Sequence, residues 1–455
     1  MQHTAEHANP LGTEPIFKLL MRFSIPAIVG MMVNALYNVV DRIFIGNSPS
    51  IGANGIAGIT IAFPIMIILI ALGVLFGIGG ATLFSIRLGQ KRNEEAEEAL
   101  FTSFILLTGG GLVFLILGQI FMPTILRMFG ASEQVLPYAS SYLRVILMGS
   151  VFAVTSMGLN HFIRADGNPK VAMLSMFLGA GTNIILDPIF IYVLDWGMAG
   201  AALATIISQS FSFIWVISYF LGKRSRVKLR FAKHRIRLSV VRSIMTLGFP
   251  PFTLQIMSSI LNVILNKTLI LHGGDLGIAA MGIVHSLQTL LFMPVIGINQ
   301  GVQPLISFNF GAKQYDRVKE AAKLGILSAT AVILVGYAVT QLFPRTMVGM
   351  FNQDPALLNL GVYALRRWFL LTPLVGYQVI AGNFFQAIGK SKIALTLTLS
   401  RQGLFLIPAI LLFAHFFGMQ GILWSAPVAD ALSTVLTSVF FFRGMRDLEK
   451  KAAHI

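Results

Sequence analysis

Long apolar runs, separated by short polar connections, dominate this chain of 455 residues. Each run is close to or longer than the roughly 20 residues that a helix needs to cross a bilayer. The composition agrees, because 55% of the residues are hydrophobic and only 11% are charged, whereas a soluble domain carries about 25% charged residues. The runs predict twelve transmembrane helices, at roughly 17–45, 54–86, 100–126, 137–163, 169–194, 199–222, 244–271, 278–306, 321–344, 360–387, 393–416 and 420–442.

Lys and Arg fall on alternate connections, and this pattern predicts the orientation of the chain. The connection after the sixth run is the most basic, and those after the second, fourth, eighth and tenth runs are basic too. The odd-numbered connections are nearly bare, with Arg127 and Arg345 as exceptions. The positive-inside rule therefore predicts that both termini are cytoplasmic in a multi-pass protein of the cytoplasmic membrane. A polar stretch up to about Gly12 precedes the first run and is expected to be mobile.

Several function classes can be set aside on composition and motifs. The formal charge of +16 would suggest a nucleic-acid partner in a soluble protein, but here the basic residues lie on connections that meet anionic lipid headgroups. No nucleic-acid partner is therefore expected. The absence of cysteine excludes disulfides and thiolate chemistry. Without a GxxxxGK[ST] motif the chain is not an ATP-driven pump, and the scattered His residues predict neither an enzyme nor a cofactor site.

The two halves of the chain repeat one another. The segment around Pro26, FSIPAIVGMMVNALYNVVDRIFIG, corresponds to LGFPPFTLQIMSSILNVILNKTLILHG around Pro250. Further along, Gly89 corresponds to Gly311, so the offset stays near 222 residues. Both halves begin and end on the same predicted side, which makes the repeat parallel, with a pseudo-two-fold axis along the membrane normal. Such a repeat is typical of transporters that bind substrate near the midplane and work by alternating access.

The repeat predicts an all-α integral membrane protein made of two six-helix bundles. We expect an N-lobe over residues 1–222, a cytoplasmic basic linker over 223–243, and a C-lobe with a cytoplasmic tail over 244–455. A channel or receptor that arose by gene duplication is the alternative, but two near-equal, loosely joined bundles favour transport.

At this point the chain resembles the MATE (multidrug and toxic compound extrusion) family, in its DinF-like bacterial branch. The resemblance covers roughly residues 15–445. It depends on six plus six spans, a Pro in the first and seventh helices, VDR at 40–42, and Gly-containing loops with a charged amphipathic segment after the second and eighth helices. It implies a monomeric secondary exporter of the bacterial inner membrane, which antiports amphipathic or cationic drugs against H⁺ or Na⁺. A lipid-linked sugar or lipid flippase of the same superfamily is the alternative.

Three acidic residues lie inside predicted spans, where an ionised side chain costs about 2.5–3.5 kcal/mol on insertion scales. They are Asp41, Asp187 and Asp430. In the second half, Asn266 stands in the place of Asp41 and Ile407 in that of Asp187. A purely structural pair would have no evident reason to disappear from one repeat. Asp41 and Asp187 are therefore the candidates for an ion-coupling site in the N-lobe.

Amides accompany both acids on their helix faces. Asn34 and Asn38 precede Asp41 at helical spacing, and Asn183 lies one turn before Asp187. Two desolvated carboxylates close together cannot both stay ionised cheaply, so one is expected to exchange a proton near neutral pH. Oxygen groups of Asp41, Asp187 and Asn183 could instead hold Na⁺.

The resemblance implies a network of Asp41, Tyr142, Asn183, Asp187 and Thr205. The structural alternative is that Asp41 pairs with Arg42 and that Asp187 caps against Pro188.

Asp430 stands alone in the twelfth span. An ion pair with Arg401 or Lys267 that stabilises the C-lobe is the first interpretation, and contact with a cationic substrate is the second. A multidrug pocket should be apolar and adaptable, for which Met is well suited. Its candidate residues are Met32, Asn34, Met66, Met176, Gln255, Met257, Met293 and Asp430.

Overall fold

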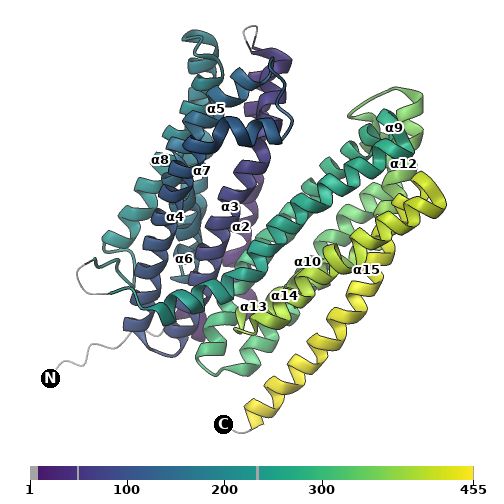
Figure 1. Ribbon diagram of the computed structural model, residues 1–455. Helices are drawn as coiled ribbons and strands as arrows, with labels where there is room; N and C mark the ends of the chain where they lie inside the picture. The colour runs from purple at the N-terminus through teal and green to yellow at the C-terminus, as the bar shows by residue number, and fades with distance from the viewer. Residues whose placement is uncertain (1–8, 49–50, 232–234, 454–455) are drawn as a thin grey trace, which may run out of the picture. The chain divides into compact units, whose positions relative to one another are not determined.

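The computed structural model describes residues 9–48, 51–231 and 235–453, and the elements in this part of the chain are helices (Figure 1). Each half of the chain also contains one short π-helix, η1 (Ile189–Val193) in the first half and η2 (Ser400–Leu406) in the second. In chain order the elements are α1 (Pro10–Thr13), α2 (Ile16–Gly46), α3 (Gly52–Gly89), α4 (Asn93–Met128), α5 (Leu136–Met148), α6 (Ser150–Ala165), α7 (Pro169–Pro188), η1 (Ile189–Val193), α8 (Gly197–Leu221), α9 (Leu238–Gly311), α10 (Tyr315–Leu342), α11 (Pro344–Gly349), α12 (Pro355–Trp368), α13 (Pro373–Ala387), α14 (Ser391–Leu399), η2 (Ser400–Leu406) and α15 (Ile407–Ala453).

The helices agree with the predicted number of membrane spans. Eight helical segments of the described chain are long and apolar enough to cross a bilayer. Two bent pairs, α5 with α6 at 56° and α12 with α13 at 48°, bring the number to 10. In addition, α9 and α15 each contain a glycine outside the helical region, Gly274 (φ 56°) and Gly418 (φ 58°), so each comprises two helices. Glycine adopts this left-handed backbone without steric cost. Twelve spans result.

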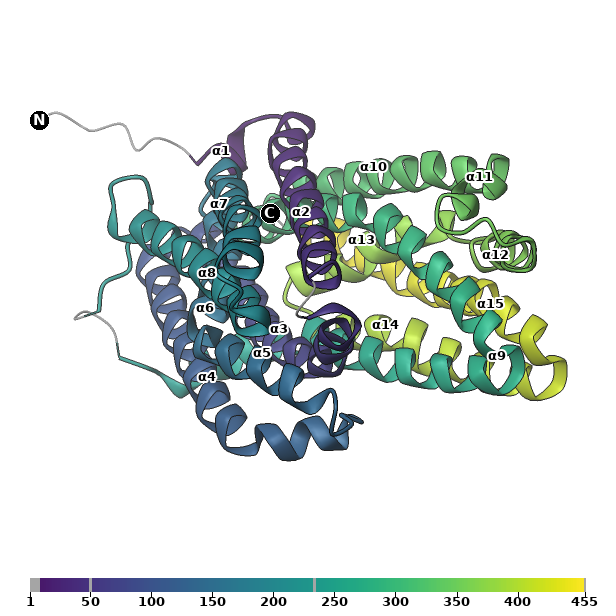
Figure 2. The same ribbon diagram turned by 90° about the horizontal axis from the view of Figure 1, so that it is seen from above.

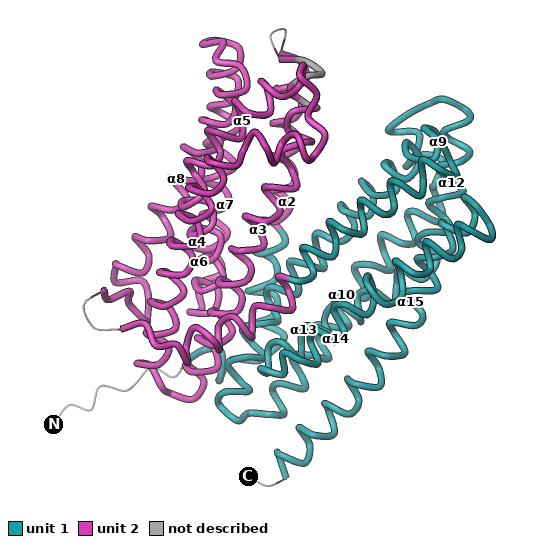
Figure 3. Tube along the Cα trace, in the orientation of Figure 1, with its two compact units in different colours: residues 1–28, 253–455 teal, residues 29–252 magenta. Residues whose placement is uncertain are grey.

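The chain forms two compact units, and their boundaries lie inside helices rather than at the predicted linker (Figure 3). Unit 1 comprises residues 1–28 and 253–455, and unit 2 comprises residues 29–252. The first part of α2 therefore belongs with the second half of the chain, and the first part of α9 with the first half. The predicted lobes, 1–222 and 244–455, differ from these units at both joints.

Close backbone contacts explain this exchange of helix segments. Within unit 1, a Cβ atom on Gly297 would lie 2.7 Å from the backbone nitrogen of Ile28. Within unit 2, a Cβ on Gly248 would lie 2.7 Å from the carbonyl carbon of Leu75. Real side chains do not tolerate such distances, so glycine is what lets each helix segment pack so tightly on the opposite half of the sequence.

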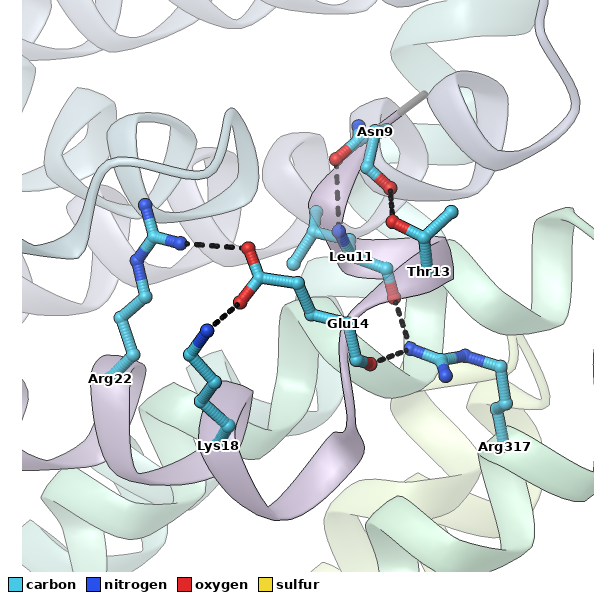
Figure 4. A network of polar contacts seen from close by, with 7 residues as sticks. All are labelled: Asn9, Leu11, Thr13, Glu14, Lys18, Arg22 and Arg317. Carbon is cyan, nitrogen blue, oxygen red and sulfur yellow. Dashed lines mark hydrogen bonds and ion pairs between the residues drawn. The ribbon is translucent and has the colours of Figure 1, made fainter. Parts of the chain in front are cut away.

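The segment before α2 is ordered by contacts within unit 1 (Figure 4). Asn9 caps the short helix α1, since its Oδ1 accepts from the Leu11 N–H at 3.1 Å. From α10, Arg317 donates to the carbonyl oxygens of Leu11 (3.1 Å) and Glu14 (2.7 Å). The expectation of a mobile stretch up to about Gly12 is therefore wrong for residues 9–12, and residues 1–8 lie outside the described part of the chain.

Each unit has its own apolar core. In unit 2, α3 packs along α4 and α6, and α7 packs along α8 (Figure 2). The core at one end of this bundle is built around buried Ile45, Tyr142 and Ile191. In unit 1, α10 packs on α13, and α15 packs on η2 and α13. Its core is centred on residues such as Trp368 and Ile410.

The basic connection before α9 is fastened to unit 2. Asp166, at the end of α6, is fully buried, and its Oδ2 accepts from the Arg226 N–H at 3.0 Å and the Ser225 hydroxyl at 3.3 Å. The Tyr219 hydroxyl of α8 donates to the same oxygen. Arg237 pairs with buried Glu98 of α4 at 3.2 Å. The connection ends at Leu238, where α9 begins, rather than at the predicted residue 243.

Asp166 should make the stability of the protein depend on pH. Burial raises the pKa of this carboxyl from 3.8 to about 6, although the hydrogen bonds from Tyr219 and Arg226 oppose the shift. Between about pH 4 and pH 6 the folded state then binds more protons than the unfolded state, so stability falls as the pH rises through this window. We expect Asp166→Asn to remove this contribution.

The measurement is the thermal midpoint of purified protein in detergent between pH 4 and pH 7. The difference between the wild type and Asp166→Asn should change across the window and stay constant above it. Asp275→Asn is the matched control, because Asp275 is an exposed acid. A pH-independent difference for Asp166→Asn would show that this carboxyl does not titrate in the folded range.

Candidate ion-coupling site

Helix α2 carries Asp41 into unit 2. The following turn of α2 places Ile45, which is fully buried, in the core. Asp41 lies one turn earlier and is 9% exposed. The apolar face that packs α2 against its bundle therefore also takes the carboxyl group out of contact with solvent and lipid.

Helix α7 carries Asp187 to the same place. Asp187 is fully buried, and α7 ends directly after it at Pro188. Proline has no backbone N–H, so one hydrogen bond of the α-helical series is missing at this residue. The chain continues instead as the π-helix η1. Such π-turns inside α-helices are frequent at functional sites.

Asp187 belongs to a buried hydrogen-bond network. The Asn183 side-chain amide donates to Asp187 Oδ1 at 3.2 Å and to Thr205 Oγ1 at 3.4 Å. The Thr205 hydroxyl in turn donates to the carbonyl oxygen of Ala201 at 3.1 Å. Three of the predicted residues, from α7 and α8, are thus brought together.

The carboxyl groups of Asp41 and Asp187 lie within hydrogen-bonding reach of one another. Two carboxylates cannot form such a bond, because an ionised carboxyl group can only accept. A hydrogen bond between the two groups can therefore form only when one of them carries a proton. The geometry is that of two acids sharing a single site, in which protonation of one acid changes the electrostatic environment of the other.

Three oxygen atoms in this network lack a donor. No donor in the described part of the chain reaches Asp41 Oδ1, Asp187 Oδ2 or Asn183 Oδ1, although all three are buried. A buried acceptor without a donor is costly. Either a proton or a hard cation with oxygen ligands, such as Na⁺, would satisfy these atoms. The residues present fit both candidate coupling ions.

Two tyrosines accompany the acids. Tyr142 is buried in the core of unit 2 and interacts electrostatically with Asp41 and Asp187, and its place in the ion-coupling network stays a prediction. Tyr37 interacts with both acids in the same way and was missed by the sequence analysis. The signal was its spacing, since Tyr37 precedes Asp41 by four residues and shares its helix face.

The amides predicted beside Asp41 do not join the network. Asn38 is exposed, and its side-chain amide donates to the carbonyl oxygen of Asn34 at 2.7 Å. Asn34 is exposed as well. The prediction that Asn38 is part of the ion-coupling group is therefore not supported by this geometry. An amide one turn from a backbone carbonyl can bond within its own helix, and here this local bond is the one formed.

Asp430 has a different environment, in unit 1. Its Oδ1 accepts from Arg401 Nε at 2.8 Å, and the side chain is 3% exposed. The π-helix η2 carries Arg401. Gln378 of α13 donates to the backbone carbonyl of Asp430 at 2.8 Å. Lys267, the other predicted partner, is exposed and is not the partner of Asp430. This arrangement favours the stabilising role of Asp430 over direct substrate contact.

The candidate pocket residues are divided between the two units, so their role as one pocket stays a prediction. Met66 packs against the unit 2 core, and Met176 contacts Arg164 and the backbone of Gly30. In unit 1, Met257 lies against Gly403. Unit 2 holds Met32, Asn34, Met66 and Met176, and unit 1 holds Gln255, Met257, Met293 and Asp430.

Comparisons with known proteins agree with this architecture. The MatE family model matches residues 26–189 and 250–412, one segment in each half. The multidrug export protein MepA of Staphylococcus aureus is 30% identical over 431 residues, 94% of each chain. The MepA of Staphylococcus haemolyticus is 28% identical over 436 residues, which are 95% of this chain and 94% of that one.

Solved structures give the same result. An outward-facing conformation of a multidrug resistance MATE family transporter has a TM-score of 0.91 at 26% identity, covering 97% of this chain and 98% of the other. A MOP superfamily transporter from Pyrococcus furiosus has the same scores and coverage, and its binding pocket is described as having reverse polarity.

Removing one partner of the Asp430–Arg401 pair should destabilise the protein. Asp430→Asn leaves the Arg401 guanidinium without its partner, and loss of one partner of a buried pair costs about 3–5 kcal/mol. We expect a lower thermal midpoint in detergent and a lower folding yield for either single variant. The double variant Arg401→Gln/Asp430→Asn should recover part of the loss, because no charge is left unpaired.

The drug-to-ion ratio of the surviving Asp430→Asn protein should equal that of the wild type. A stable single variant with an altered ratio would instead assign Asp430 to the ion pathway.

Proposed function

Since the chain belongs to the MATE family of membrane transporters, we propose that it is a secondary active multidrug exporter. It antiports amphipathic or cationic drugs against H⁺ or Na⁺. The relatives named multidrug export protein, which align over 94% of this chain, support the substrate class. The family and the relatives are those of transporters, which supports a role other than that of an enzyme.

The observation that carries the proposal is the buried pair Asp41 and Asp187. A hydrogen bond between the two carboxyl groups can form only when one of them is protonated, and Asp41 Oδ1 and Asp187 Oδ2 have no donor among the described residues. Such a site can exist with the coupling ion bound or with the ion released, and the two forms differ by one positive charge. The charge released on unloading can be balanced by a cationic drug, and this exchange is antiport. The second repeat has Asn266 and Ile407 in the corresponding places, so the coupling ion binds in one half.

The cycle is alternating access between two lobes, with the coupling ion held by the first. Ion binding and drug binding each favour one orientation of the lobes, and a ligand shifts such an equilibrium only by its difference in affinity for the two states. In this proposal the protein works as a monomer in the bacterial inner membrane, and the basic connections support cytoplasmic termini.

The first test is drug efflux by Asp187→Asn. We expect this change to abolish energised efflux while expression and membrane insertion remain normal, because the amide keeps the shape of the carboxyl group but cannot take up or release a proton. The measurement is ethidium efflux from membrane vesicles under an imposed pH gradient and, separately, under an imposed Na⁺ gradient. The gradient that drives the wild type identifies the coupling ion.

Asp354→Asn is the matched control. Asp354 is exposed and caps α12 by accepting from the Ala356 N–H, and Asn is an equally good cap. This variant should transport like the wild type. Wild-type efflux by Asp187→Asn would remove Asp187 from the ion pathway.

The second test asks whether the two acids act as one site. Drug affinity for purified protein should weaken as the pH falls, because protonation removes the negative charge that balances the drug cation. In Asp41→Asn the midpoint of this dependence should move to lower pH, since Asp187 then loses the repulsion of a neighbouring carboxylate.

Drug binding at a series of pH values provides the measurement, with Asp354→Asn again as the control. An unchanged midpoint in Asp41→Asn would mean that the two carboxyl groups titrate independently.

A further inference from the structure

A cavity of about 380 Å³ lies in unit 2 where α8 ends. Its walls include Val171 of α7, Trp215 and Tyr219 of α8, and the first two residues of the basic connection, Lys223 and Arg224. None of the lining residues is acidic. The cavity is thus bounded by two membrane helices and two cationic side chains, at the C-terminal end of the sixth predicted span.

Lys223 and Arg224 are exposed, and neither forms an ion pair with a described residue. Other cations of the same connection are paired, since Arg230 meets Glu97 and Arg237 meets Glu98. The buried acid Asp166 is not among the lining residues, and it accepts from the cavity residue Tyr219. Lys223 and Arg224 line the cavity, so their positive charges are available to a ligand bound there.

The backbone that carries these cations is held in place. Directly after Arg224, the Ser225 hydroxyl and the Arg226 N–H both donate to Asp166. The Leu229 N–H then donates to the carbonyl oxygen of Phe220 at the end of α8, at 3.2 Å. A preorganised loop loses less conformational freedom when it binds a ligand.

An apolar track leads away from the cavity along both helices. On α7, Leu174 and Leu178 follow Val171 at helical spacing and are 43% and 39% exposed. On α8, Phe211 precedes Trp215 by one turn and is 51% exposed. Trp215 fixes the two helices together, because its indole N–H donates to the carbonyl oxygen of Val171 at 3.2 Å. Trp residues with one polar and one apolar side favour the membrane–water interface.

We infer that this cavity binds the phosphate headgroup of an anionic phospholipid, whose acyl chains lie along the exposed faces of α7 and α8. Lys223 and Arg224 bind the phosphate, and the apolar track accommodates the chains. Basic pockets between membrane helices bind lipid headgroups in this manner. A free phosphate would use the two cations but not the track, so the alkyl chains distinguish the two ligands. The site is separate from the acid pair and does not depend on the proposed transport activity.

Fluorescence quenching by brominated lipids tests the site directly. The chain has four Trp residues, so the Trp215 signal is the difference between a protein and its Trp215→Phe variant. The probes are phosphatidylglycerol and phosphatidylcholine with brominated acyl chains, in otherwise identical mixed micelles. Half-maximal quenching of Trp215 should need roughly 25-fold less phosphatidylglycerol than phosphatidylcholine, because each of the two cations contributes about a fivefold factor in affinity for an anionic lipid.

The variant Lys223→Gln/Arg224→Gln should lose this preference. Arg443→Gln/Arg446→Gln removes two exposed charges at the far end of the chain and should keep it. Equal quenching by both lipids in the wild type, or an unchanged preference in Lys223→Gln/Arg224→Gln, would overturn the proposal. So would loss of the preference on addition of inorganic phosphate at millimolar concentration, which would identify a simple anion site.

A second measurement needs no variant. Native mass spectrometry of the wild-type protein, released from micelles with equal amounts of both lipids, should show retained phosphatidylglycerol in excess over phosphatidylcholine. Equal retention of the two would count against the site even if the double variant does not fold.

Discussion

A carboxyl group inside a bilayer has to be protonated, paired with a cation or surrounded by fixed donors, because the hydrocarbon offers none of these. The two compact units meet this constraint in different ways. In unit 1, Asp430 is paired with Arg401, so the charges of the two side chains cancel. In unit 2, Asp41 and Asp187 face one another, and Asn183 provides a single donor. In the second arrangement no cationic side chain balances the acids, so a bound ion can do so.

In each unit, a buried titratable side chain lies beside a break in an α-helix. The π-helix η1 begins two residues after Asp187, and η2 contains Arg401. A π-turn contains about one residue more than an α-helical turn. This changes the direction of the neighbouring side chains and weakens the local backbone hydrogen bonds. In the first half, Pro188 lies at the break and removes one backbone N–H from the α-helical hydrogen-bond series. In the second half, η2 contains no proline, and it carries Arg401, the partner of Asp430.

The sequence predicted the structural features that arise from neighbouring residues in the chain, but not those that depend on contacts between distant residues. The length of the apolar runs predicted the helices, and the loss of both acids from the second repeat pointed to Asp41 and Asp187. Tyr37 was missed because one Tyr in an apolar run carries no distinguishing signal, although its spacing from Asp41 was visible. The division of α2 and α9 between units was missed for a different reason. It depends on close backbone contacts at Gly297 and Gly248, and contacts between distant parts of a chain leave no periodicity to detect.

This division gives the proposed coupling site a direct covalent connection to the other half of the protein. Asp41 lies in the part of α2 that belongs to unit 2, while Ser24 and Ile28, in the preceding turns, pack within unit 1 on Gly301 and Gly297. Under the proposed mechanism, loading the acid pair changes the forces on α2 at Asp41. The same helix is held in unit 1 by contacts too close to accommodate a Cβ atom. A conformational change at the ion site can therefore be transmitted to unit 1 through α2. A side chain introduced at Gly297 would disturb the packing of the same helix within unit 1.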